Sequence, residues 1–348
     1  MKNKWTILMI LTLVFGSFKS SRLHAQQVEK FERISIDDGL SQNTVRAILQ
    51  DSEGFMWFGT HDGLNKYDGY EFGYFMNDQG DSSTISNNEI TSIVEDKDGG
   101  LWIGTNGGGL NKYDKRTKLF KRYRHNSEVS NSLVSDFVFS LLIDSENMLW
   151  IATLEGVNSY NIRTGKFHVY SQNKGGLSHN RSESLSEDGY GNIWVGTRNG
   201  LNKIDKRSGK IKHYKSDPSD FSSLQNSNVR SLYTDQFGDL WLGTLGGGLS
   251  KYIHETDQFW HYQITADIPI KKRSIEYITC ITEDHMGNLW FGSWGNGVQK
   301  LNKETGEMTR YKNIANDPKS LSYKWAKANI MMTQTMISQA SFLETLTW

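Results

Sequence analysis

Short apolar runs recur along the chain, separated by polar turns rich in Gly, Asp and Asn. The clearest run is a tryptophan followed two residues later by Gly-Thr or a close variant. Its successive copies lie 45, 48, 44, 47 and 49 residues apart and centre on Trp57, Trp102, Trp150, Trp194, Trp241 and Trp290. A period of this size with strand-like units is typical of a β-propeller. Because one unit cannot bury its apolar face alone, the copies are expected to pack on one another.

The second copy shows what one unit contains. Residues 90–96, 101–105, 110–114 and 119–123 are apolar or alternate apolar with polar residues, as short strands do. The residues between them are turn formers, with Asp, Asn and Gly at the positions that tight turns favour. The sequence therefore predicts an all-β fold, a β-propeller of four-stranded blades with six full repeats and a partial seventh, over residues 26–322.

The repeated tryptophans and the scattered polar groups suggest little chemistry. Each tryptophan holds a fixed place in a second strand, which favours packing between blades over an aromatic ligand box. Gly-rich segments such as 106–109 are not followed by a helix and indicate turns, and the nine histidines show no metal-ligand spacing. We therefore expect no catalytic residue, no metal and no cofactor, and we expect the single cysteine, Cys280, to be a buried thiol.

One position varies while the frame around it is nearly constant. The residue after each Gly-Thr is His61, Asn106, Leu154, Arg198, Leu245 or Trp294. The loops that carry these residues should open on one face of a propeller, and a rigid frame with varied tips suits recognition. The pattern predicts a polar-ligand site, with Trp294 stacking on a sugar, made of His61, Asp62, Asn106, Arg198, Asn199, Trp294 and Asn296. The alternative is that these are solvated turn residues.

The N-terminus resembles an export signal. Lys2 and Lys4 precede an apolar run over residues 5–15, too short for a membrane span, and Ala25 offers a cleavage site. We expect residues 1–25 to be a signal peptide and the rest to be periplasmic, without a membrane span; the alternative is a membrane anchor. The whole chain has 39 basic and 39 acidic residues. The signal would remove four basic residues and no acid, and the resulting net charge of −4 argues against nucleic acid as a partner.

Two motifs point to a family. Gly39-Leu-Ser-Gln-Asn-Thr-Val45, together with Leu101-Trp-Ile-Gly-Thr and the following Gly-Gly-Leu-Asn-Lys-Tyr-Asp114, resembles the two-component regulator propeller family over about residues 29–322. The resemblance implies the periplasmic sensor region of a hybrid two-component histidine kinase, with two seven-bladed propellers followed by a small β-domain, a membrane helix, a kinase, a receiver and a DNA-binding module. It also implies an oligosaccharide or similar polar ligand. The alternatives are a propeller lyase-type enzyme, since such enzymes have a similar repeat, and a non-functional gene remnant.

Residues 323–348 depart from the repeat. A seventh Trp-x-Gly-Thr is due by about residue 340 at this spacing but does not occur. Methionine has a single codon, so a shifted reading of the segment around Met331 and Met332 gives Asp-Asp, close to the turn that the repeat requires. Our hypothesis is that a frameshift replaced this tail and left a truncated propeller. Unpaired strand edges would then favour self-association.

Overall fold

The computed structural model describes residue 31 and residues 34–173, 176–262, 277–294, 296–317 and 319–321. Their regular structure is all β, in six four-stranded antiparallel sheets that form the blades of a six-bladed β-propeller. The one helix in these residues is the 3₁₀ turn η2 (Ile36–Asp38). The predicted fold class is confirmed.

Each blade is a meander whose strands follow chain order. Blade 1 contains β1 (Val45–Gln50), β2 (Met56–Thr60), β3 (Leu64–Tyr67) and β4 (Phe72–Phe75), and blade 2 contains β5 (Ile90–Glu95), β6 (Leu101–Thr105), β7 (Gly109–Asp114) and β8 (Leu119–Tyr123). Blade 3 contains β9 (Val138–Ile143), β10 (Met148–Thr153), β11 (Gly156–Asn161) and β12 (Lys166–Tyr170), and blade 4 contains β13 (Ser182–Glu187), β14 (Ile193–Thr197), β15 (Gly200–Ile204) and β16 (Ile211–Tyr214). Blade 5 contains β17 (Val229–Thr234), β18 (Leu240–Thr244), β19 (Gly248–Ile253) and β20 (Gln258–His261), and blade 6 contains β21 (Ile278–Glu283), β22 (Leu289–Ser293), β23 (Gly297–Leu301) and β24 (Met308–Tyr311).

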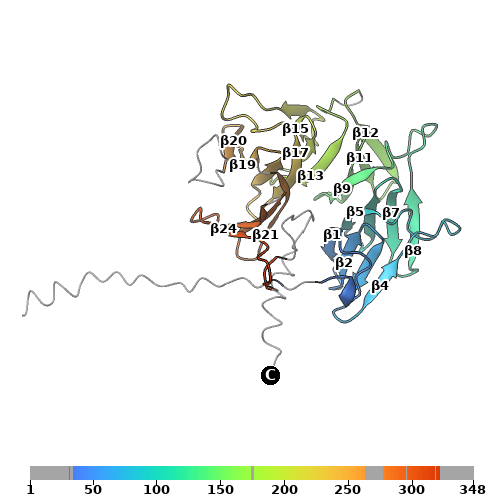
Figure 1. Cartoon of the computed structure of the whole chain (residues 1–348). Coiled ribbons are helices and arrows are strands. Elements are labelled where there is room, and N and C mark those ends of the chain that lie inside the picture. The colour runs from blue at the N-terminus through green and yellow to red at the C-terminus, as the bar shows by residue number, and fades with distance from the viewer. Residues whose placement is uncertain are drawn as a thin grey trace, which may run out of the picture. The chain divides into compact units, whose positions relative to one another are not determined.

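The first strand of each blade is the innermost, and consecutive blades meet through these strands. Contacts run from β1 to β5, β9, β13, β17 and β21 in turn, while the fourth strands lie at the periphery (Figure 1). The second strands are almost entirely buried. Five of them, all but that of blade 3, contain a glycine, and in blades 1, 2, 4 and 5 this glycine lets the next blade approach closely. A Cβ at Gly59 would lie 2.5 Å from a side-chain carbon of Ile90, and one at Gly104 would lie 2.6 Å from Val138.

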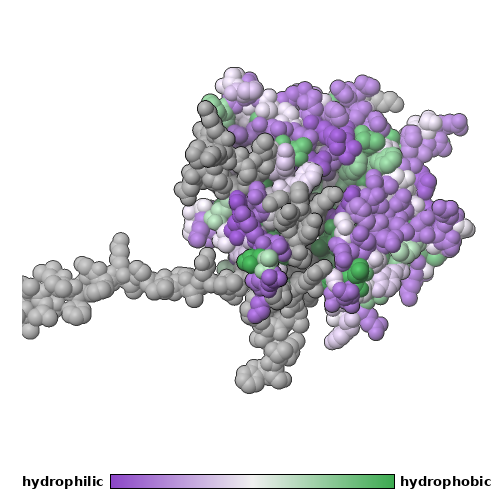
Figure 2. Space-filling model, viewed as in Figure 1, coloured by the Kyte–Doolittle hydropathy of each residue, from purple (hydrophilic) through white to green (hydrophobic). Residues whose placement is uncertain are grey.

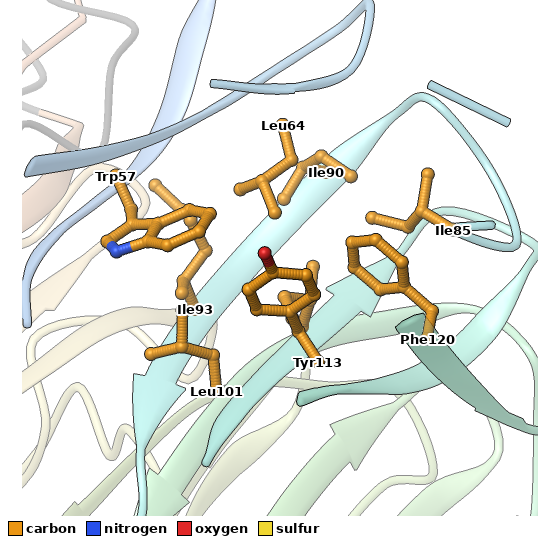
Figure 3. Close-up of a cluster of buried hydrophobic side chains, with 10 residues drawn as sticks. Trp57, Leu64, Ile85, Ile90, Ile93, Leu101, Tyr113 and Phe120 are labelled. Carbon is orange, nitrogen blue, oxygen red and sulfur yellow. The ribbon is translucent and has the colours of Figure 1, made fainter. Parts of the chain in front are cut away.

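The repeated tryptophans form the core between blades. All six are at most 3% exposed, which confirms that they are core residues. Trp57 projects from blade 1 toward Ile93, Leu101 and Tyr113 of blade 2 (Figure 3), and its ring centroid lies 5.5 Å from that of Tyr113.

A buried aspartate anchors each tryptophan. The indole N–H donates to a carboxylate in the turn before the same strand, at 2.8–2.9 Å, in the pairs Trp57–Asp51, Trp102–Asp96, Trp150–Asp144, Trp194–Asp188, Trp241–Asp235 and Trp290–Asp284. The same aspartates accept backbone N–H groups of their turns, for example from Gly100 to Asp96. One carboxylate therefore fixes both the turn and the indole orientation, and the buried carboxylate and indole N–H are paired with each other.

Lysine clamps join the blades in pairs. Lys115 of blade 2 lies 3.0 Å from Asp51 of blade 1 and 2.8 Å from Glu95 of its own blade. Lys206 and Lys303 repeat this arrangement in blades 4 and 6, with Asp144 and Glu187 and with Asp235 and Glu283. The equivalent positions in blades 3 and 5 hold Ile162 and His254. Among the described blades, the lysine clamps therefore join blade 1 to 2, blade 3 to 4 and blade 5 to 6. We call each such pair of blades a two-blade unit.

The loops between blades are also repeated. The loops after blades 1 to 4 each bury one aliphatic residue, namely Ile85, Leu133, Leu177 and Leu224. The loop after β24 follows the same design, because the Asn313 side-chain amide donates to the Leu321 carbonyl as Asn77 does to Ile85, both at 2.6 Å. The start of a seventh repeat is thus present as far as Leu321.

Other predictions concern parts of the chain that the structure does not describe. The signal peptide, residues 1–25, and the tail, residues 323–348, lie outside the described residues. Within the described part, no helix is long and apolar enough to cross a membrane. Cys280 in β21 is a buried thiol, as predicted.

Candidate functional site

Every innermost strand carries a β-bulge at its second residue. The register against the second strand slips by one residue between Val45 and Ala47 in blade 1, and at the equivalent place in every other blade. The bulged residues are Arg46, Thr91, Phe139, Glu183, Arg230 and Thr279. A bulge changes the direction of a side chain and often lies beside a site.

The bulges adjoin the varied tips. The backbone N–H of each tip residue donates to the carbonyl of the residue just before its blade's first strand, which we call the opener. The pairs are His61–Thr44, Asn106–Glu89, Leu154–Phe137, Arg198–Arg181, Leu245–Asn228 and Trp294–Tyr277. Tip, opener and bulge therefore meet at one end of every blade. We call these three sets of residues the tip ring.

Blades 1 and 2 share a charge-balanced part of the tip ring. The Arg46 side chain donates from Nε to Nε2 of His61 at 2.7 Å and contacts Glu89 through Nη2 at 3.1 Å. The Asn106 amide donates to the other oxygen of Glu89 at 2.8 Å. One arginine thus faces one carboxylate here.

Blades 4 and 5 share a part with excess positive charge. Arg181 Nε, Arg198 Nε and Arg230 Nη1 all contact Oε1 of Glu183, at 2.7, 3.1 and 2.7 Å. We call these four residues the arginine cluster. Burial raises the pKa of Glu183. The charges of Arg230 and Arg181 and the hydrogen bonds from Arg181 and Arg198 lower it by more than burial raises it, so the pKa lies below the usual value. Glu183 is therefore ionised at neutral pH.

Aromatic residues flank this cluster on both sides. The Arg181 guanidinium lies 4.5 Å from the ring centroid of Phe139 in blade 3. In blade 6, the ring centroids of Tyr277 and Trp294 are 5.8 Å apart, and Trp294 is 45% exposed. The tip ring therefore has both cationic and aromatic groups on neighbouring blades. The visible surface of the described residues is mainly hydrophilic, with small separate hydrophobic groups (Figure 2).

The predicted site residues fall into different places. His61, Asn106, Arg198 and Trp294 belong to the tip ring. His61 and Asn106 lie where blades 1 and 2 meet, Arg198 belongs to the arginine cluster, and Trp294 packs on Tyr277 in blade 6. Asp62 accepts a hydrogen bond from Asn88 in the loop between blades, and Asn199 is an exposed turn residue. Asn296 lies in the turn between β22 and β23.

Sequence reasoning missed the bulge residues and the openers, including Arg46, Glu89, Arg181, Glu183 and Arg230. They could have been found by the same signal as the tips. The second residue of the innermost strand also varies in a nearly constant frame, as the comparison of Val45-Arg46, Ser182-Glu183 and Val229-Arg230 shows.

A cavity of about 430 Å³ lies away from the tip ring, against the outer strands β16 and β20. Beside it, Tyr214 and Tyr252 donate to Asp257 at 2.6 and 2.7 Å, and Lys212 pairs with the same carboxylate. Burial raises the pKa of Asp257, but the hydrogen bonds from Lys212 and the two tyrosines lower it to about 2. These contacts join blades 4 and 5 at their outer edge, so we interpret them as structural. Among the described residues, no group of three or more His, Cys, Asp or Glu side chains is placed to hold a metal.

The comparisons with known proteins agree on the class of protein. The sequence model of the family described as two component regulator propeller matches residues 39–62, 84–107, 176–199, 223–246 and 273–295. Each match ends at the tip of a blade, in blades 1, 2, 4, 5 and 6. The unmatched third blade is the one with Ala152 in place of the repeated glycine.

Solved structures and one curated protein show the same relationship. The extracellular domain of a protein described as a hybrid two component system from B. thetaiotaomicron is 28% identical, with a TM-score of 0.74 over 86% of this chain and 39% of that one. "Histidine kinase P4" of Formosa agariphila is 41% identical over 78 residues, 22% of this chain and 6% of that protein. Virginiamycin B lyase from Staphylococcus aureus, at 14% identity, a TM-score of 0.59 and coverage of 79% of this chain and 86% of that one, shows the fold alone.

The fold and the tip ring thus define a repeat propeller with varied residues gathered at one end of its blades. More specifically, five of these six blades match the two-component regulator propeller repeat. The chain spans well under half the length of the first two of these relatives, so their whole activity does not follow from the match.

Proposed function

We propose that this chain is the exported ligand-sensing part of a two-component regulator and binds an oligosaccharide or similar polar ligand at the tip ring. The observation that carries the proposal is the tip ring itself. A constant frame of tryptophans, aspartates and glycines holds residues of different chemistry at equivalent positions in six blades. Such a division between rigid scaffold and varied loop residues is how many propellers and barrels present binding groups.

The relatives support the sensing role. The structure described as an extracellular domain of a hybrid two component system covers most of this chain, and the matched curated protein is named a histidine kinase. The proposed role is to bind a ligand outside the cell and to pass a conformational change to a kinase. The proposal gives this chain a binding role and no catalytic one, and places it in the periplasm.

Trp294→Ala should weaken oligosaccharide binding about tenfold or more. An exposed indole offers a flat apolar face to a sugar ring, and tenfold corresponds to about 1.4 kcal/mol. We would screen the chain on an array of neutral and acidic oligosaccharides and measure the affinity of the best ligand by isothermal titration calorimetry.

The control is Trp260→Ala. Trp260 is 62% exposed but lies on β20, at the outer edge of blade 5. Equal weakening by both substitutions would place the ligand elsewhere or show a nonspecific effect. Cleavage of the bound oligosaccharide, detected by mass spectrometry, would instead favour the lyase-type alternative.

A further inference from the structure

The arginine cluster is not balanced by its own carboxylate. Three guanidinium groups share one oxygen of Glu183, which leaves a formal excess of two positive charges. Other ion pairs of the blades are built differently. Arg46 faces Glu89 one to one, and the lysine clamps place one cation among two or more carboxylates. A group that served only to hold blades together would not need three mutually repelling cations.

The contacts with Glu183 use only part of the hydrogen-bonding capacity of each arginine. Each contacts Glu183 through a single nitrogen, whereas a guanidinium has five N–H donors in a planar fork. The side chains of Arg181, Arg198 and Arg230 are 27%, 47% and 32% exposed, while that of Glu183 is 8% exposed. Glu183 is thus the buried partner that holds the three arginines, whose side chains are partly exposed. Such forks bind carboxylate and sulfate oxygens in two-point contacts.

The cluster also stands between aromatic groups. Phe139 of blade 3, the preceding blade, lies against Arg181. The Tyr277–Trp294 pair belongs to blade 6, the blade that follows the one carrying Arg230. Aromatic faces and convergent charged donors together suit a ring that has an apolar face and an acidic substituent.

We propose that Arg181, Arg198 and Arg230 bind the acidic group of an oligosaccharide, the carboxylate of a uronic acid or the sulfate ester of a sulfated sugar. The inference rests on the proposed function and names the chemical class of its ligand. Glu183 acts as a positioning residue that holds the three guanidinium groups together.

The test compares acidic oligosaccharides with their neutral forms. Calorimetric titrations would use oligogalacturonides and sulfated galactan oligosaccharides, with their carboxyl-reduced and desulfated forms as neutral partners. We expect at least one acidic form to bind tenfold or more tightly than its neutral partner, and its affinity to fall as salt is raised. Binding of the oligogalacturonide would identify a carboxylate as the bound group, and binding of the sulfated galactan oligosaccharide would identify a sulfate ester.

Variants locate the contact. Arg198→Gln and Arg230→Gln should each weaken binding of the acidic form tenfold or more and leave binding of the neutral form unchanged. Arg207→Gln removes the same charge from an exposed turn between β15 and β16 and should have no effect. Circular dichroism of each variant would confirm that the propeller is folded.

The outcomes separate the two proposals. If neutral and acidic forms bind equally well, or if the arginine variants bind the acidic form as the unmodified chain does, the assignment of the cluster is wrong while the sensing role stands. If the folded chain binds none of these oligosaccharides and none on the array, both proposals are wrong.

Discussion

Trp102→Ala is expected to lower the free energy of unfolding by about 3–5 kcal/mol, the range for truncating a large buried aromatic residue. The Trp102 indole packs against Leu133, Leu149 and Tyr160 at the junction of blades 2 and 3. Its loss leaves a cavity there and takes the N–H donor from the buried Asp96 carboxylate. Urea denaturation followed by circular dichroism would measure the change.

Trp260→Ala is the matched control for this experiment. The same side chain is removed, but from an exposed position on an outer strand, where the effect should be within about 0.5 kcal/mol. Comparable destabilisation by the two variants would contradict the assignment of the repeated tryptophans to the core between blades.

Lys206→Met should destabilise the chain by about 3–5 kcal/mol, the cost of leaving buried carboxylates without their cation. Burial lowers the pKa of the Lys206 ammonium, but hydrogen bonds to Glu187 and Asp144 raise it more, so the pKa lies above its usual value. The Asp144 side chain is fully buried, and methionine keeps the length of the lysine but none of its charge. The same denaturation experiment applies.

Lys210→Met serves as the comparison, because Lys210 is exposed in the turn that follows Lys206. It should change the free energy of unfolding by no more than about 0.5 kcal/mol. If the two lysine variants were equally stable, the clamps would contribute little to the free energy of unfolding, as surface ion pairs do. The two-blade unit would then not be stabilised by its lysine.

Much of the fold follows from local sequence. Asp96–Gly100 and the residues around Trp102 predict their turn and strand, because tight turns need Asp and Gly and a strand between blades needs apolar residues on both faces. The burial of Trp102 and of Cys280 follows in the same way, since both stand in strands that neighbouring blades cover.

The site was harder to predict, for physical reasons. A bulge adds one residue without changing the apolar pattern around it, so Glu183 and Arg230 cannot be told from ordinary strand residues in a single repeat. The contact between them crosses from one blade to the next and depends on how the blades are placed. The lysine clamps have the same origin: Lys206 reaches back to Asp144 in the preceding blade, a pairing that no local pattern contains.

Hydrogen–deuterium exchange with and without the bound oligosaccharide tests the central claim most directly, because it reports where the ligand lies. Binding at the tip ring predicts slower exchange at the openers and first residues of β13, β17 and β21 and in the turn after β14, around Arg181, Arg198, Arg230 and Tyr277. The outer turns, such as that between β15 and β16, should exchange as before. Slower exchange confined to the outer strands β16 and β20, with the tip ring unchanged, would contradict the account.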